Sequence, residues 1–136
     1  MLTPTITNLE GTPGSYATIA AAGSVTVSLA LGAGAGVATN ILTGSLEVEV
    51  VIGPTPPSAN PLVQFTYSDD GTKYYNDRGP YIAGAIGVPA GQVANGSYDY
   101  AYTPQAMGVQ AIAVTISNPG NEPITVLVQG VTVVQS

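Results

Sequence analysis

The sequence of 136 residues predicts an all-β protein, an antiparallel β-sandwich or jelly roll in one domain. Three observations support this fold class. Apolar residues alternate with polar or small residues along several short segments, as in half-buried antiparallel strands. Turn-forming residues, among them 17 Gly and 11 Pro in the whole chain, separate these segments. No segment combines helical spacing of apolar residues with helix caps.

Two segments in the first half of the chain show the alternation most clearly. In residues 24–31 the larger apolar side chains occupy every second position, and small side chains occupy the others. In residues 45–52 apolar positions alternate with Glu47 and Glu49, so we expect these carboxylates on the outer side of a strand. Further strands are predicted at residues 62–68, 97–102, 110–117 and 124–134.

The segments between the strands predict specific connections. Ser68-Asp69-Asp70-Gly71 is typical of a hairpin turn and joins residues 62–68 to residues 72–76. Residues 118–121, which read Asn-Pro-Gly-Asn, predict the same kind of connection between the last two long strands. Gly130 interrupts the alternation of the final strand, which indicates a β-bulge at this position.

Three further regions are predicted to be irregular. Residues 1–15 contain two Pro and two Gly and predict an extended N-terminal arm, which precedes a β-sandwich domain over residues 16–136. The proline-rich residues 54–61 predict an exposed crossing loop. Residues 77–96 predict a long, mostly irregular loop, a kind of segment that usually has a functional role or a partner.

The composition excludes several function classes. The absence of His and Cys excludes Ser-His-Asp and Cys-His catalysis, ordinary zinc sites and disulfides. Two basic residues and a net charge of −6 exclude binding to nucleic acid or to an anionic membrane surface, and no segment has the apolar length of a membrane span. Only 7% of residues are charged, against about a quarter in typical soluble domains. Such a surface favours burial against partners, so we expect a homo-oligomer.

Tyrosines form the most distinctive side-chain pattern. Tyr98, Tyr100 and Tyr102 alternate along one predicted strand and therefore share a face. That face is either a stacking platform for sugar rings or a packing surface, in the core or between subunits. Tyr74, Tyr75 and Tyr81 add aromatic surface beside the long loop, where a subunit interface is the alternative.

Acidic residues cluster around the predicted hairpin. Asp69, Asp70 and Asp77, together with Asn76, supply the oxygen ligands that calcium prefers. Their spacing matches no EF-hand loop, and Asp-Asp-Gly is also a good turn, so we expect a turn and neither a metal nor a cofactor. Asp99 with one of these residues would make a carboxylate pair for glycoside hydrolysis. Such a pair needs a cleft that shifts the pKa values of its two carboxyl groups, and nothing in the sequence indicates one. We therefore expect no enzyme.

Two segments carry a family resemblance. Residues 63–75 place Ser68-Asp69-Asp70-Gly71-Thr72 between two strands, and residues 111–128 place Asn-Pro-Gly-Asn between two more. This arrangement resembles small β-sandwich virion structural proteins of tailed bacteriophages, most of all a capsid decoration (cement) protein. The resemblance implies a non-enzymatic, often trimeric protein on the capsid exterior, which binds between subunits of the major capsid protein and stabilises the shell.

Two hypotheses follow for the function. The leading hypothesis is capsid decoration, with contacts made by the N-terminal arm and the long loop. Its candidate contact residues are Thr3, Pro4, Thr5, Ile6, Tyr74, Tyr75, Arg78 and Tyr81. The alternative is a carbohydrate-binding β-sandwich module of a phage tail or a secreted protein, which would bind sugar through Tyr98, Tyr100 and Tyr102.

Overall fold

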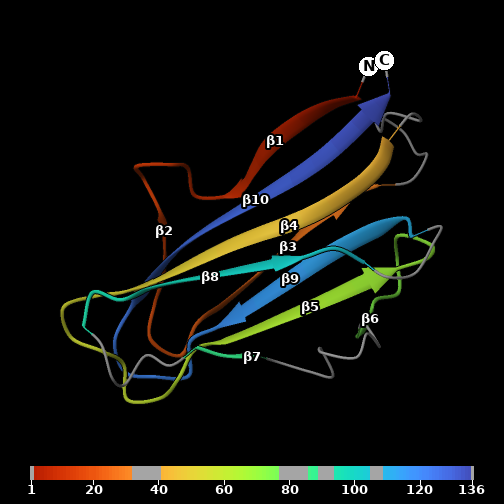
Figure 1. Cartoon of the computed structure of the whole chain (residues 1–136). Coiled ribbons are helices and arrows are strands. Elements are labelled where there is room, and N and C mark those ends of the chain that lie inside the picture. Colours follow the sequence, from red (N-terminus) through yellow and green to blue (C-terminus); the bar gives the residue numbers. More distant parts are fainter. Residues whose placement is uncertain (1, 32–40, 77–85, 89–93, 105–108, 136) are drawn as a thin grey trace.

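The computed structural model describes residues 2–31, 41–76, 86–88, 94–104 and 109–135 of the chain. Over these residues the protein is all-β, and two antiparallel sheets pack face to face as a β-sandwich (Figure 1). The predicted fold class is therefore confirmed. The described part of the chain contains no helix, and hence none that could span a membrane.

The first sheet, called sheet 1 here, is formed by strands from both ends and the middle of the chain. Its order is β1 (Leu2–Glu10), β10 (Ile124–Gln135), β4 (Ile41–Ile52) and β8 (Ser97–Tyr102), with β2 (Ala17–Ile19) also paired to β10. Leu2 pairs with Gln135, so the two ends of the chain lie side by side at one end of the sandwich (Figure 1).

The second sheet, sheet 2, packs against the first. Its order is β3 (Ser24–Ala30), β9 (Ala111–Ser117), β5 (Leu62–Ser68) and β6 (Tyr75–Asn76), and β7 (Ile86–Gly87) also pairs with β5. Its three longest strands, β3, β9 and β5, have seven residues each and lie in regular antiparallel register.

The core lies between the sheets and consists of the inward residues of the alternating strands. In residues 46–52 of β4 the inward side chains are at most 2% exposed, while Glu47 and Glu49 point outward as predicted. The largest fully buried side chains come from both sheets: Phe65, Leu46, Ile52, Ile112, Ile116, Ile124, Val50, Val63, Val88, Val114, Val126 and Val128.

The β-bulge predicted at Gly130 is wrong. Gly130 pairs in regular register with Thr7 on one side and with Leu46 on the other. Gly130 occupies the next inward position of β10 after Val128. A Cβ atom at Gly130 would lie 2.8 Å from Cδ1 of Leu29 in the opposite sheet. Glycine therefore makes room for the leucine. The register shifts of β10 occur opposite Asn8/Glu10 of β1 and at Val133/Val134.

The two predicted hairpins have different outcomes. The turn at residues 68–71 does join β5 to β6, with Thr66 opposite Asn76, although the second strand has only two residues. Residues 118–121 join β9 to β10, which belong to different sheets, so the predicted hairpin is wrong. The side chain of Asn118 is buried in this connection and donates hydrogen bonds to the carbonyl oxygens of Ile19, Ala20 and Glu122.

The segments predicted to be irregular carry some regular structure. Residues 2–10 of the predicted arm are extended and form β1 against β10. In the predicted loop 77–96, the described residues include β7 and the fully buried Val88. Residues 54–61 cross from sheet 1 to sheet 2 as predicted, but Pro57 and Pro61 are buried, so the loop is not exposed throughout.

Candidate functional site

A groove of about 340 Å³ lies on the outer face of sheet 1. The groove is lined by residues of three neighbouring strands of this sheet, β10, β4 and β8: Glu47, Val48, Glu49, Asp99, Tyr100, Ala101, Leu127 and Gln129. Among the described residues that line the groove, three are carboxylates and none is basic. The groove therefore presents hydrogen-bond acceptors and negative charge.

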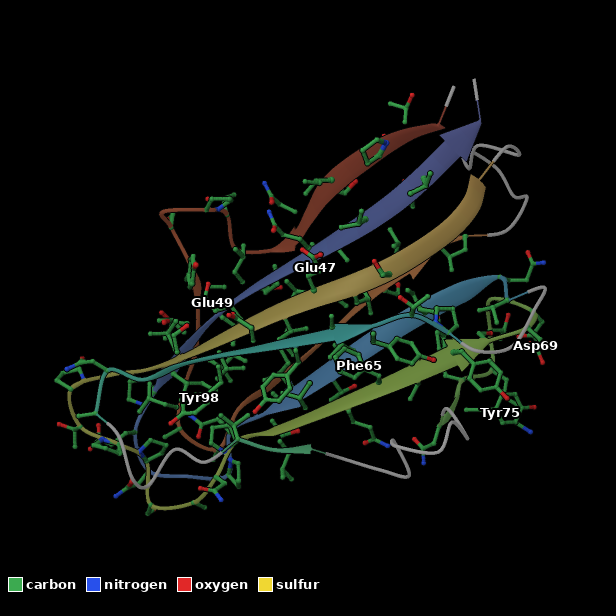
Figure 2. The ribbon with its side chains drawn as sticks, in the orientation of Figure 1. Glu47, Glu49, Phe65, Asp69, Tyr75 and Tyr98 are labelled. Atoms are coloured by element: carbon green, nitrogen blue, oxygen red, sulfur yellow. The ribbon has the colours of Figure 1, made fainter. Side chains whose placement is uncertain are left out.

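Strand register brings the polar side chains of the groove together. Glu49 lies opposite Leu127 on β10 and opposite Asp99 on β8. One step further along the strands, Glu47 lies opposite Gln129. Because side chains alternate between faces, these residues all point away from the core. Figure 2 labels Glu47 and Glu49 on β4, far from Asp69 and Tyr75 at the hairpin of sheet 2.

Glu49 is held by two hydroxyl groups. The Tyr16 hydroxyl donates a hydrogen bond to its Oε1, and the Ser97 hydroxyl donates one to its Oε2. These bonds, the one from Ser97 most strongly, lower the pKa of Glu49, whereas the bond to Glu49 raises the pKa of Tyr16. The carboxylate is thus ionised and fixed in orientation beside Asp99.

Gln129 connects the groove to the edge of the sheet. Its Nε2 donates a hydrogen bond of 2.9 Å to Oδ1 of Asn8 on β1. Leu127, its neighbour along the outer face of β10, is only 8% exposed and supplies an apolar surface within the groove. The groove thus combines polar side chains, of which Glu49 and Gln129 are held by hydrogen bonds, with a small apolar surface.

The predicted tyrosine face is on the inner side of β8. Tyr102 is 3% exposed and stacks on Phe65, with ring centroids 5.0 Å apart and an angle of 14° between the planes. Tyr98 and Tyr100 are partly buried against the same core, and burial raises the pKa of Tyr100. The three rings share a face as predicted, and that face packs toward sheet 2, on the opposite side of sheet 1 from the outward carboxylates of the groove. Of the three tyrosines, Tyr100 also borders the groove.

The candidate contact residues lie in two separate places. Thr3, Pro4, Thr5 and Ile6 are exposed on the edge strand β1, where Ile6 is 63% exposed. Tyr74 and Tyr75 are 37% and 41% exposed at the hairpin of sheet 2, and Lys73 Nζ lies 5.2 Å from the ring centroid of Tyr75. Arg78 and Tyr81 lie outside the described residues.

Asp70 has the role of a turn residue, as predicted. Its Oδ1 accepts hydrogen bonds from the backbone N–H groups of Thr72 (2.8 Å) and Lys73 (2.9 Å) and from the Ser68 hydroxyl (3.1 Å). These bonds lower the pKa of Asp70, the one from Lys73 most strongly. Asp77 lies outside the described residues, and within them no group of three acidic residues is placed to hold a metal ion.

Sequence reasoning missed the groove, although part of the signal was present. The alternation placed Glu47 and Glu49 on an outer face, and Asp99 alternates with the tyrosines of its strand. What joins them is the strand order β10-β4-β8, which brings together strands that are not consecutive in the chain.

Comparison with known proteins finds similarity at the level of the fold. No family model and no curated protein matches the sequence. Latent PorU from Porphyromonas gingivalis matches with a TM-score of 0.54 and 8% identity, over 98% of this chain and 13% of that one. The CBM22-1–GH10 modules of xylanase 10B from Clostridium thermocellum, complexed with xylohexaose, match with a TM-score of 0.51 and 13% identity, over 98% and 25%.

A smaller protein matches over most of both chains. The family 29 carbohydrate-binding module CBM29-2 covers 96% of this chain and 92% of its own, with 12% identity and a TM-score of 0.46. The chain spans only a small part of PorU and of the xylanase. At 8% and 13% identity, the matches to PorU and to the xylanase, both with TM-scores above 0.5, show a similar fold and nothing beyond it.

Proposed function

We propose that this protein is a non-catalytic module that binds a neutral carbohydrate in the groove of sheet 1. The observation that carries the proposal is the set of outward polar side chains that three adjacent strands contribute to one groove. The proposed site differs from the tyrosine platform of the sequence-based alternative, because those tyrosines face the other side of the sheet.

The groove offers groups that suit sugar hydroxyls. Carboxylate oxygens of Glu47 and Asp99 accept hydrogen bonds, and the Gln129 amide both donates and accepts them. Glu49 adds an ionised acceptor whose position is already fixed by Tyr16 and Ser97. Fixed polar groups lose little conformational entropy on binding, which favours affinity. Leu127 supplies an apolar contact for the non-polar face of a sugar ring.

The charge of the groove selects among carbohydrates. Three carboxylates line it, and the whole chain has a net charge of −6. Like charges placed together at an interface cost binding energy, so uronic acids and sulfated sugars are disfavoured. A neutral polysaccharide is the ligand class that fits. The fold shared with a xylanase structure that contains xylohexaose supports this choice at the level of architecture.

The test is affinity electrophoresis in gels that contain a soluble polysaccharide. Xylan, mixed-linkage β-glucan and mannan serve as neutral probes, and polygalacturonate serves as the anionic probe. We expect at least one neutral probe to retard the protein and polygalacturonate not to do so. Glu47→Ala and Gln129→Ala each remove polar groups from the groove and should weaken binding about tenfold.

The matched control is Gln64→Ala. Gln64 lies on sheet 2, where its Nε2 donates a hydrogen bond of 2.6 Å to Oδ1 of Asn76. This variant removes a similar outward amide outside the groove and should bind as the wild type does. Binding by polygalacturonate alone, or no retardation by any neutral probe, would overturn the proposal.

Capsid decoration stays a prediction from the sequence and has a separate test. None of the three structures named above is described as a virion protein. The copy number of the chain in purified phage particles, relative to the major capsid protein, decides this role. Comparable copy numbers support decoration of the lattice, and absence from particles contradicts it.

A further inference from the structure

β3 is an edge strand that lacks the features by which most sheet edges avoid pairing. It is last in the strand order of sheet 2, so alternate backbone N–H and C=O groups point away from the sheet. Residues Ser24–Ala30 contain no charged residue and no proline, and their register with β9 is regular over all seven pairs. Among the described strands β3 pairs with β9 alone, so its other side is left for a further strand.

The other edge strands carry such protection. β1 contains Pro4 and has a register shift between Asn8 and Glu10. β8 carries Asp99 near its middle. β6 and β7 have two residues each, and β2, which pairs only with β10, has three. Proline, bulges, charges and short length are the ways in which natural sheets block their edges. Among the described strands, this leaves β3 as the edge suited to adding a strand.

The side chains of β3 also favour a neighbouring strand. Val25 and Val27 face the interior but are only partly buried, at the margin of the core. A strand paired with β3 would cover their remaining apolar surface. On the outer face, the hydroxyl oxygens of Thr26 and Thr115 already form a cross-strand hydrogen bond of 2.9 Å with β9. The same kind of contact is open to a strand on the other side.

The sequence of β3 is complementary to itself. Residues 24–28 read Ser-Val-Thr-Val-Ser, the same in both directions. When two such strands pair antiparallel about a two-fold axis at Thr26, each threonine faces its symmetry mate, Ser24 faces Ser28 and Val25 faces Val27. Hydroxyls then meet hydroxyls on the outer face and valines meet valines on the inner face. Such cross-strand pairs stabilise antiparallel sheets.

We propose that two copies of this protein associate through β3, antiparallel about a two-fold axis at Thr26, and join their second sheets into one. A self-complementary patch that binds itself is the usual basis of a symmetric dimer. One edge strand per copy makes a small interface, so the dimer is reversible. The proposal specifies a dimer in place of the trimer that the family resemblance implies, and it does not depend on ligand binding in sheet 1.

Single-cysteine variants test the register directly, because the chain has no cysteine of its own. Thr26→Cys places two thiols directly opposite each other across the axis, within reach of a disulfide. Mild oxidation should convert most of this variant to a species of twice the 13.6 kDa chain mass. Thr26 is exposed, so the substitution leaves the core intact.

The matched control is Ser24→Cys. Its two copies lie about 13 Å apart along the paired strands, because four residues separate positions 24 and 28. This variant alone should not cross-link, whereas an equimolar mixture of Ser24→Cys and Ser28→Cys should. Equal cross-linking of Thr26→Cys and Ser24→Cys would overturn the proposed register.

Sedimentation of the unmodified protein gives a second measurement. We expect a monomer–dimer equilibrium over a dilution series. Thr26→Lys should be monomeric, since it places two like charges face to face, and mixing it with Thr26→Glu should restore the dimer. A wild type that stays monomeric at every concentration, or that forms a trimer, would overturn the proposal.

Discussion

Glu49 illustrates how neighbouring strands determine the state of one side chain. The carboxylate is part of β4, whereas its two hydroxyl donors lie outside that strand: Tyr16 just before β2 and Ser97 at the start of β8. Each bond is stronger when the acceptor is ionised, which is why the pKa of Glu49 is lowered. Because the donors bond this group only in the folded protein, its ionisation is linked to stability.

This linkage predicts a pH dependence with a defined sign. The pKa of Glu49 is lower in the folded protein than its ordinary value of 4.5, so its contribution to stability is present above pH 4.5. The contribution disappears as the pH falls through the lowered pKa of the folded state. Glu49→Gln resembles the protonated group. We expect this variant to melt at a lower temperature than the wild type at neutral pH, and the difference to vanish in acid.

The measurement is thermal unfolding followed by circular dichroism over a pH series. Glu47→Gln is the control, because it removes the same charge from the next outward position of β4. A difference between Glu49→Gln and wild type that persists unchanged below the folded-state pKa would contradict the assigned hydrogen bonds.

At the scale of elements, alternation predicted the central strands well. Residues 62–68 and 97–102 match β5 and β8, because both strands carry a clear period of two. β4 begins at Ile41, before the predicted start at residue 45, and continues through Gly44. A Cβ atom at Gly44 would lie 2.2 Å from Cδ2 of Leu31, so this glycine accommodates a neighbour and does not end the strand.

The connections were harder to predict than the strands. Asn-Pro-Gly-Asn has the composition of a hairpin turn, but whether a turn stays within one sheet depends on where the next strand packs. The Asn118 amide bonds carbonyl oxygens near β2 and β10, and its Oδ1 accepts a hydrogen bond of 3.2 Å from the N–H of Gly120. The carbonyl partners Ile19 and Ala20 lie 99 and 98 residues earlier in the sequence, so local composition does not report these bonds.

The bonds of Asn118 predict a large loss of stability on truncation. Asn118→Ala leaves buried carbonyl oxygens without their donor and should lower the free energy of unfolding by about 2–4 kcal/mol. Asn121→Ala is the control in the same connection, because Asn121 is exposed and accepts one bond of 2.9 Å from the N–H of Ser58. It should cost less than about 1 kcal/mol. Urea denaturation compares them, and equal losses would contradict the role assigned to Asn118.

At the scale of the whole molecule, the sequence predicted the sandwich but not the site. The alternation identified which residues point outward, Glu47 and Glu49 among them. Which outward residues become neighbours depends on the order of the strands, and the order β10-β4-β8 is not readable from local patterns. The tyrosines attracted a functional interpretation because they share a face, yet that face belongs to the core, where Tyr102 stacks on Phe65.

The central claim is that the groove of sheet 1 binds a neutral carbohydrate, and a titration of the ¹⁵N-labelled protein with xylohexaose tests it most directly. We expect the largest changes in amide chemical shift at residues 47–49, 99–101, 127 and 129, which line the groove. Amides of β5 and β9 in sheet 2 should not change. Changes centred on the hairpin at residues 68–76, or no change with this or any other neutral oligosaccharide, would contradict it.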